Sequence, residues 1–312
     1  MHVFHGLPGR AERRACALSI GNFDGIHRGH RALLRRVVEV ARERGLVAAA
    51  MTFEPHPREF FTPQQAPARI ANLRDKIEGL SQSGIEQVFV QHFTRSFASL
   101  GPEPFIQRVL VEGCHARWLL VGDDFRFGAR RAGDVALLRA CGQAGGFGVE
   151  QIDPVLEAGE RVSSSRIRAA LQQGDLAQAR TLLGHAYAIS GRVLHGSKLG
   201  RQLGFPTLNL RVAHRRPAVH GIFAVRVHGI DPGCRPGVAS IGLRPTIEDS
   251  GRWVLEVHLF DFSEEVYGRL IKVEFVQKLR DEARFDSIAD LTAAIRSDAD
   301  RARAIFDGAL TQ

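Results

Sequence analysis

The sequence predicts a doubly wound, Rossmann-like α/β domain followed by an antiparallel β-barrel or sandwich with a C-terminal helix. A chain of 312 residues is too long for one ordinary hydrophobic core. Up to about residue 186, short apolar segments alternate with amphipathic helical segments. From residue 187 onward, short strands are separated by proline and glycine. We therefore expect two domains, at 1–186 and 187–312.

The first domain is expected to hold a buried parallel sheet with crossover helices. Its apolar segments are short and continuous, as in strands that are covered on both faces. In the first helix, apolar residues share one face, arginines occupy the other, and Gly45 follows as the C-terminal cap. The strands are expected at Cys16–Ile20, Leu46–Phe53, Gln87–Gln91 and Trp118–Val121, and further helices at Asn72–Gln82, Glu103–Glu112 and Val135–Gln143.

The second domain is expected to be mostly β. Its strands alternate in polarity and end at proline or glycine, which is typical of an antiparallel barrel or sandwich. A final helix at Ser287–Phe306 is expected to cover one face or edge, with Ile288, Leu291, Ile295, Ala302 and Ile305 on its apolar side. The strands are expected at Ile189–His195, Ile222–Val227, Gly237–Ile241, Trp253–Phe260 and Leu270–Gln277, after bridging helices at Ser165–Gln172 and Leu176–Leu183.

Composition narrows the class of protein. With 44% hydrophobic and 24% charged residues, the chain is not prone to disorder. A net charge of +8, carried mostly by arginine, fits nucleotide substrates, a nucleic acid or a solvated basic surface. No basic tail or stacking-aromatic motif supports nucleic-acid binding. Four scattered cysteines, no signal peptide and no membrane-length apolar run predict a cytoplasmic protein.

The segment GNFDGIHRGH, residues 21–30, joins the first expected strand to the first helix. Glycines let the backbone approach a phosphate, and free N–H groups at a helix start favour negative charge. His27 and His30 are three residues apart, so both imidazoles can face one way and stabilise charge on a leaving pyrophosphate. The alternative is a helix cap and a turn with solvated histidines.

Three further segments follow expected strands or open a helix. TFEPHP at 52–57 has prolines that stiffen a loop, although proline is also a plain strand terminator. VGDDFRFG at 121–128 combines two carboxylates with two aromatic rings, which either border a second substrate or pack in a core. RVSSSRIR at 161–168 places hydroxyls and arginines at a helix start, where they serve as a cap, a phosphate clamp or both.

In this order the four motifs resemble the FMN adenylyltransferase module of bacterial bifunctional FAD synthetases, within the nucleotidyltransferase superfamily. The resemblance implies that His27 and His30 engage ATP phosphates. The sequence departs from the family at Ser165, where threonine is usual, and at Asp124, where some members carry asparagine. The implied ATP-side residues are Gly21, Phe23, Asp24, Gly25, His27, His30, Arg161, Ser164 and Ser165, and the FMN-side residues are Pro55, His56, Asp124 and Phe125.

The glycine-rich segment GRVLHGSKLGRQLGFPTLN, residues 191–209, predicts a loop shaped around phosphate by backbone N–H groups. It lacks the GxxxxGK[ST] pattern of P-loop kinases. Thr207 and Asn209 alternate across Leu208, so they point one way on an extended segment. A hydroxyl and an amide oxygen are suitable ligands for a Mg²⁺ ion that bridges nucleotide phosphates. The alternative interpretation of Thr207 and Asn209 is a turn that carries a polar pair.

Glu256 is an acidic residue within the apolar strand LEVHLFDF, residues 255–262. Alternation places Glu256 and His258 opposite Leu255, Val257 and Leu259. Solvation of this glutamate is the default interpretation. Phosphoryl transfer to an alcohol, however, benefits from a carboxylate that orients the hydroxyl and accepts its proton.

The second half resembles the riboflavin kinase module through GRVLHG, GRQLGFPTLN, HGIFAV, GVASIGLRPT, LEVHLFDF and KLRDEARF. The resemblance implies a six-stranded barrel and Glu256 as base for the ribityl hydroxyl. Departures are Ser240 in place of asparagine and Ala294 in place of glutamine. The implied nucleotide and metal residues are Gly204, Pro206, Thr207 and Asn209, with Thr207 and Asn209 as Mg²⁺ ligands, and the implied flavin-side residues are Glu256, Arg280, Glu282 and Phe285.

Together the two modules predict an enzyme that phosphorylates riboflavin to FMN and then adenylylates FMN to FAD. Riboflavin, FMN and ATP are the expected partners, Mg²⁺ the expected cofactor, and nucleic acid and membranes are not expected. One rival is an adenylyltransferase for another phosphate ester with the barrel as an accessory. Another is a flavin-binding or regulatory module without catalysis. The kinase motifs argue against the first rival, and the polar residues named above argue against the second.

Overall fold

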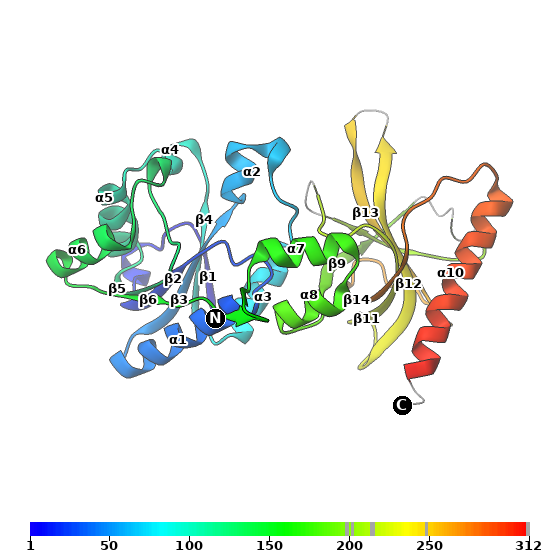
Figure 1. Cartoon of the computed structure of the whole chain (residues 1–312), viewed down its shortest axis with the longest axis horizontal. Helices are drawn as coiled ribbons and strands as arrows, with labels where there is room; N and C mark the ends of the chain where they lie inside the picture. Colours follow the sequence, from blue (N-terminus) through cyan, green and yellow to red (C-terminus); the bar gives the residue numbers. More distant parts are fainter. Residues whose placement is uncertain (197–199, 201–202, 213–215, 247–248, 310–312) are drawn as a thin grey trace. The chain divides into compact units, whose positions relative to one another are not determined.

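The structure is a computed structural model that describes residues 1–196, 200, 203–212, 216–246 and 249–309 (Figure 1). Side chains are described for all of these residues except 244–246, 249–252 and 309. Contacts divide the chain into two units. The first comprises Met1–Pro67 and Leu73–Ser163, and the second comprises Ala68–Asn72 and Ser164–Gln312.

The first unit is built on a six-stranded sheet in the order β1-β4-β3-β2-β5-β6. All of its strand pairs are parallel. The strands are β1 His2–His5, β2 Cys16–Ile20, β3 Val47–Glu54, β4 Gln87–His92, β5 Ala116–Gly122 and β6 Gly148–Ile152; a separate hairpin pairs β7 Leu156–Glu157 with β8 Glu160–Arg161. The helices are η1 Arg10–Glu12, α1 Arg28–Arg44, α2 Pro57–Phe61, η2 Pro63–Gln65, α3 Leu73–Gln82, α4 Arg95–Ala98, α5 Pro102–Pro104, η3 Phe105–Gly113, η4 Ala129–Arg131 and α6 Val135–Gly145.

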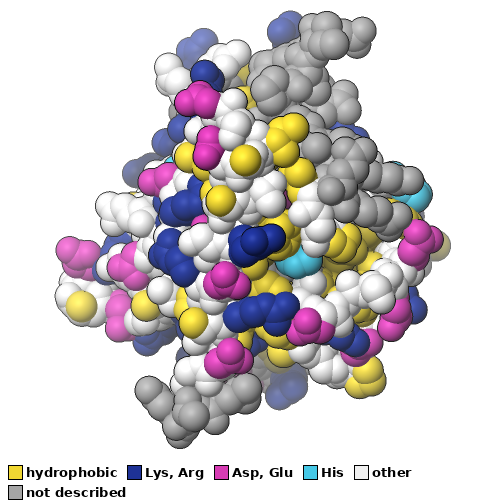
Figure 2. Space-filling model, turned by 90° about the vertical axis from the view of Figure 1, so that its right-hand side faces the viewer, with side chains coloured by type: hydrophobic (Ala, Val, Ile, Leu, Met, Phe, Trp, Pro, Cys, Tyr) yellow, Lys and Arg dark blue, Asp and Glu magenta, His cyan; other side chains and the backbone are white. Residues whose placement is uncertain are grey.

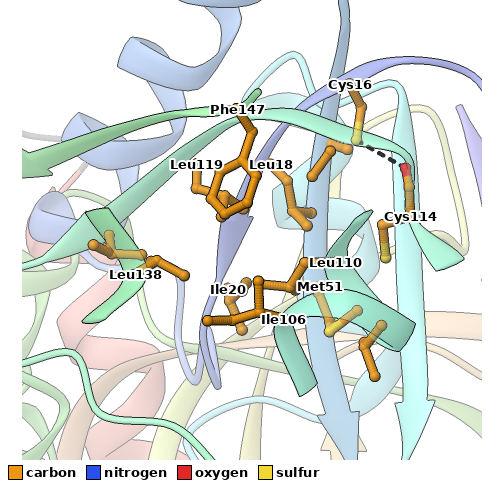
Figure 3. Packing of buried hydrophobic residues seen from close by; sticks show 14 of the residues in the cluster. Cys16, Leu18, Ile20, Met51, Ile106, Leu110, Cys114, Leu119, Leu138 and Phe147 are labelled. Carbon is orange, nitrogen blue, oxygen red and sulfur yellow. Dashed lines mark hydrogen bonds between the residues drawn. The ribbon is translucent and has the colours of Figure 1, made fainter. Parts of the chain in front are cut away.

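Alternate residues of the strands face two hydrophobic cores, which makes this unit doubly wound. On β2, Leu18 belongs to the core beneath η3 and α6, whereas Ala17 belongs to the core beneath α1 and α3. Figure 3 shows the first of these cores, with the Cys16 thiol hydrogen-bonded to the Cys114 carbonyl oxygen at 3.2 Å. Gly45 ends α1 in the left-handed conformation, as expected, with φ of 63°.

The second unit is a closed antiparallel barrel in the order β10-β13-β12-β11-β14-β9. Closure removes every free strand edge. The barrel strands are β9 Ala188–Leu194, β10 Leu208–Arg211, β11 Gly221–His228, β12 Cys234–Thr246, β13 Asp249–Leu259 and β14 Leu270–Arg280.

The described part of the second unit also contains the helices α7 Ser164–Gln173, α8 Leu176–Leu183 and α10 Ile288–Ala309. Ala299, Ala302 and Phe306 of α10 pack on the outer barrel face, against Ala224 and Val238 among others. The segment Ala68–Asn72 also belongs here, because Asn72 donates to the Ser190 carbonyl oxygen at 2.9 Å.

The predicted fold classes are confirmed, and β2 and α8 have the expected bounds. The strands β1, β6 and β10 were not expected as separate strands; β1 and β10 have only four residues each, and every residue of β6 is at least partly exposed. The helix expected at Glu103–Glu112 is present as α5, which has proline in its first turn, and the π-helix η3, which follows it without a break in helical backbone. Ile288, expected on the covered side of the last helix, is 67% exposed.

Within the residues that the structure describes, no helix is both long enough and apolar enough to span a membrane. On the face in Figure 2, acidic and basic side chains are interspersed, so the net charge of +8 does not gather there in one patch.

We expect the buried cysteines to resist alkylation. Burial raises the pKa of Cys16 to about 12 and also raises the pKa of Cys114, so both stay protonated at pH 8, whereas Cys234 is exposed. Because the thiolate is the nucleophile, iodoacetamide at pH 8 should modify Cys234 first. Peptide mass spectrometry reads the order, and modification of Cys16 as fast as Cys234 in the folded protein would contradict the packing.

Candidate active sites

The expected phosphate loop lies between β2 and α1, and it brings His27 and His30 together. His27 is the N-cap of α1, where its Nδ1 accepts the backbone N–H of His30 at 3.2 Å. The two rings stack with centroids 3.6 Å apart and planes inclined by 16°. The spacing of three residues therefore does place both imidazoles together at a helix start, where anions are favoured.

The loop backbone needs unusual conformations to make this turn. Gly25 has φ of 90°, and Phe23 and Ile26 have φ of 48° and 41°, which is the left-handed region. The Phe23 ring packs edge-on against His30, with centroids 5.3 Å apart. A side chain at Gly29 would start 3.2 Å from the His27 ring. Gly21, Asp24 and the other predicted ATP-side residues up to His30 thus lie on one tightly packed segment.

Arg161 and Asp124, predicted on opposite sides of the site, are ion-paired. The Arg161 guanidinium lies 3.0 Å from a carboxylate oxygen of Asp123 and 3.0 Å from one of Asp124. Arg161 ends the hairpin β7–β8, and Glu157 of the same hairpin is ion-paired with Arg28 in the first turn of α1. The hairpin is therefore held by ion pairs at both ends, and no motif in the sequence pointed to the Glu157 contact.

Pro55 and His56 follow β3, at the same sheet edge as the loops after β2 and β5. His56 is the N-cap of α2, and its Nδ1 accepts the Arg58 N–H at 3.1 Å. Phe125 is partly buried and stacks on Phe127, a core residue, with centroids 5.5 Å apart. Phe127 thus packs in the core, and Phe125 keeps a partly exposed ring.

Phe61 is an aromatic residue that the motifs did not single out. It is 61% exposed and lies at the end of α2. Its ring is in edge contact with Phe93, with centroids 5.6 Å apart, and Phe93 in turn contacts Phe97. The position of Phe61 shortly after the Pro55–His56 motif is the sequence feature from which it could have been predicted as a site residue.

Ser164 and Ser165 form the first turn of α7 in the second unit. Their joint action with His27 and Arg161 stays a prediction, as does the domain boundary at 186/187.

In the barrel, strand register brings together residues that are far apart in sequence. Asn209 of β10 lies directly opposite Glu256 of β13, and Glu256 lies opposite Ser240 of β12. Directly opposite residues of antiparallel strands share a face. This face is opposite the buried Leu255 and Val257, as alternation predicts, and Glu256 is half-buried on it.

Asn209 and Thr207 form a compact polar pair. The Asn209 side chain is buried, and its amide nitrogen donates to the Thr207 carbonyl oxygen at 3.3 Å. A side chain at Gly196 would start 2.4 Å from this amide, so bare glycine backbone covers it. Gly204 has φ of 84°, and the Pro206 carbonyl oxygen is 2.9 Å from His258 Nδ1. Residues 197–199 and 201–202 of the predicted phosphate loop lie outside the described residues.

The donor set at Thr207 and Asn209 fits a magnesium ion. A hydroxyl and an amide oxygen are hard ligands, and Mg²⁺ commonly keeps waters and substrate phosphates as its remaining ligands. In the part of the chain that is described, no three His, Cys, Asp or Glu side chains are grouped to hold a metal ion. Waters and nucleotide phosphates would therefore complete the coordination.

The predicted flavin-side loop is held by Arg280. Its Nε and one terminal nitrogen bind the buried carboxylate of Asp298 on α10, the latter at 2.6 Å, and the other nitrogen donates to the Asp281 carbonyl oxygen. The Arg280 guanidinium also lies over the ring of Phe285, with its central carbon 5.7 Å from the ring centroid. In this structure Arg280 thus anchors the loop to the last helix.

Glu282 reaches back to the polar face of the barrel. Its carboxylate fills the space that a side chain at Gly242 would occupy, and Gly242 shares a face with Ser240, two residues away. Desolvation raises the pKa of Glu282. The structure therefore gathers Asn209, Glu256, Ser240 and Glu282 on one face of the barrel.

A parallel sheet with paired histidines at a helix start, followed by a closed barrel with a polar face, defines a two-module enzyme of the nucleotide-dependent transferase class. A family model for FAD synthetase matches residues 9–166, and one for riboflavin kinase matches residues 183–306. The chain belongs to the family of bifunctional riboflavin kinase/FMN adenylyltransferases.

Similar proteins support this assignment over the whole chain. The bifunctional riboflavin kinase/FMN adenylyltransferase of Escherichia coli K12 is 46% identical over 297 residues, which cover 95% of each chain. Proteins described in the same words from Pseudomonas fluorescens and Haemophilus influenzae are 46% and 44% identical over 306 and 294 residues, covering 98% and 95% of those proteins and 98% and 94% of this chain. A solved structure described as a macrolide-efflux protein from Streptococcus pneumoniae has a TM-score of 0.74 at 28% identity, covering 95% of this chain and 96% of that one.

We expect Asp298→Asn to loosen the second unit. The change removes the negative charge that holds Arg280 but keeps the shape of the side chain. Breaking a largely buried ion pair should lower the free energy of unfolding by about 1–3 kcal/mol. Denaturant unfolding measures the effect, with Asp300→Asn on the exposed side of α10 as the matched control. Equal stability of the two variants would mean that the pair does not anchor α10.

Proposed function

We propose that this protein phosphorylates riboflavin to FMN in its barrel and adenylylates FMN to FAD in its α/β unit. The observation that carries the proposal is that each family-matched segment has its own set of polar residues. His27 and His30 stack at the start of α1, and Asn209 lies opposite Glu256 across two barrel strands. Two sites with different residue types fit two different phosphorus reactions.

In the kinase reaction, the Glu256 carboxylate orients the terminal ribityl hydroxyl and accepts its proton as oxygen attacks the ATP γ-phosphorus. The bond from that phosphorus to ADP breaks, and ADP leaves. Thr207 and Asn209 would hold Mg²⁺, which when bound would neutralise charge on the phosphate oxygens. Asn209 lies directly opposite Glu256, so the amide that would bind the metal is adjacent to the carboxylate that orients the hydroxyl.

In the adenylyl transfer, a phosphate oxygen of FMN attacks the ATP α-phosphorus, and pyrophosphate leaves. This nucleophile is already an anion, so the step needs positioning and charge neutralisation more than a base. His27 and His30 donate hydrogen bonds to the departing phosphates at the helix start. The glycine-rich backbone around Gly25 lets those phosphates approach closely.

Arg161 changes partners when substrate binds. Its guanidinium is shared by Asp123 and Asp124, so phosphate must replace at least one carboxylate. Asp123 and Asp124 would then lie next to the phosphate of FMN, and their negative charges would repel it. The aspartate at 124, in place of asparagine, therefore tunes how readily Arg161 is released.

The flavin ring of FMN binds near the ends of β3 and β5. Phe125 keeps a partly exposed ring there, and Phe61 offers a largely exposed one on α2. Aromatic faces bind a flat ring by offset stacking. Pro55 and His56 lie between β3 and α2 and limit how the loop can move.

We further propose that the enzyme works with Mg²⁺ in the cytoplasm, where reduced cysteines persist.

We expect Glu256→Gln and the double variant His27→Ala/His30→Ala to have reciprocal effects. Loss of the carboxylate should reduce FMN formation by about 10²-fold or more, because the hydroxyl loses its proton acceptor. FAD formation from supplied FMN should persist. Loss of both imidazoles should reduce FAD formation by about 10²-fold or more and spare FMN formation. Chromatography of flavins after incubation with ATP and Mg²⁺ measures both steps.

The two variants are controls for each other, since each retains one activity in a folded chain. A parallel loss of both steps in folded protein would show that the sites are not separate. Bound but unconverted riboflavin in the unaltered protein would favour a flavin-binding module instead.

A further inference from the structure

Lys76 of α3 is buried directly behind the phosphate loop of the first unit. Its side chain is 1% exposed, which is rare for a lysine. Its ammonium group donates to the Thr52 hydroxyl at 3.1 Å, and the same hydroxyl donates to the backbone carbonyl oxygen of Asn22 at 3.2 Å. Thr52 is itself fully buried in β3. A short chain of hydrogen bonds therefore joins a buried cation to the loop that carries His27.

The loop needs such support. Phe23 and Ile26 have left-handed φ angles, which cost free energy for residues with side chains and persist only where the surroundings hold them. Asn22, which receives the Thr52 hydrogen bond, directly precedes Phe23. On the other side of the turn, α3 packs so closely that a side chain at Gly79 would start 2.8 Å from Ile26. The helix that supplies Lys76 thus also fixes the shape of the loop.

We propose that Lys76 is a positioning residue for adenylyl transfer, acting through Thr52 on the phosphate loop. Its hydrogen bond fixes the Thr52 hydroxyl so that the hydroxyl proton points at the Asn22 carbonyl oxygen, which holds the strained turn in place. Lys76 does not touch the nucleotide in this mechanism.

The test uses full-length protein and steady-state FAD formation from FMN and ATP. Lys76→Met should lower kcat/KM for ATP by about 10- to 100-fold and raise KM for ATP, because the loop loses a charged hydrogen bond. KM for FMN should change by less than about twofold, since the pair supports only the phosphate loop. Lys76→Arg, which keeps the charge, should recover part of the loss.

Several controls separate positioning from folding. Arg74→Met removes an exposed cation from the same helix and should leave both KM values unchanged. Phosphorylation of riboflavin by the barrel reports on the second unit, and thermal unfolding reports on the whole chain. A partly unfolded preparation lowers apparent kcat but leaves KM for ATP unchanged, so the rise in KM is the decisive readout.

Substitutions at Thr52 provide a second test, in which the buried lysine itself is kept. Thr52→Val removes the hydroxyl with little change of shape and should raise KM for ATP, whereas Thr52→Ser should behave nearly as threonine does. The double variant Lys76→Met/Thr52→Val should be no worse than Lys76→Met, because both changes break the same chain of hydrogen bonds. An unchanged KM for ATP in Lys76→Met, equal behaviour of the Val and Ser variants, or fully multiplying effects would each overturn the proposal.

Discussion

Parallel pairing of β2 with β3 and β5 is the constraint on which the first unit depends. Ile20 lies opposite Met51, and Ser19 lies opposite Leu120, so the three strands end at one edge of the sheet. The loop of His27, the Pro55–His56 turn and the Asp123–Asp124 pair therefore emerge side by side. None of these segments could assemble a site alone. Their meeting follows from the register of strands whose two faces are covered by apolar cores.

In the barrel, the antiparallel strand register brings the polar residues together. A shift of one residue between β10 and β13 would carry Asn209 or Glu256 to the opposite face. Closure of the barrel prevents such a shift, because every strand is paired on both sides. Gly196 and Gly242 then leave room above this face for the Asn209 amide and the Glu282 carboxylate. The polar residues are thus positioned by backbone pairing, and glycine leaves the space around them.

The sequence predicted what depends on local pattern. Periodicity located β2, α1 and α8, and the spacing of His27 and His30 predicted their pairing at a helix start. It could not predict the Asn209–Glu256 alignment, since register across a barrel depends on strands 47 residues apart in the chain. The Arg280–Asp298 and Arg28–Glu157 pairs are invisible for the same reason. Lys76 was hidden differently, because a lysine in an amphipathic helix is normally solvated.

The basic side chains around the phosphate loop of the first unit are of two kinds, partly exposed arginines and a buried lysine. Arg28 and Arg161 are partly exposed and already paired with carboxylates, so a phosphate gains only the difference between its own interaction and the one it replaces. That difference is small and is screened by salt, so these arginines do not hold pyrophosphate tightly after the reaction. Lys76 is shut off from water, and its hydrogen bond to the Thr52 hydroxyl lies in the interior. In our proposal this bond is a fixed property of the fold, present before ATP arrives and after pyrophosphate leaves. The phosphate loop is therefore held in shape in advance, whereas the partly exposed arginines exchange their partners as substrates bind and products leave.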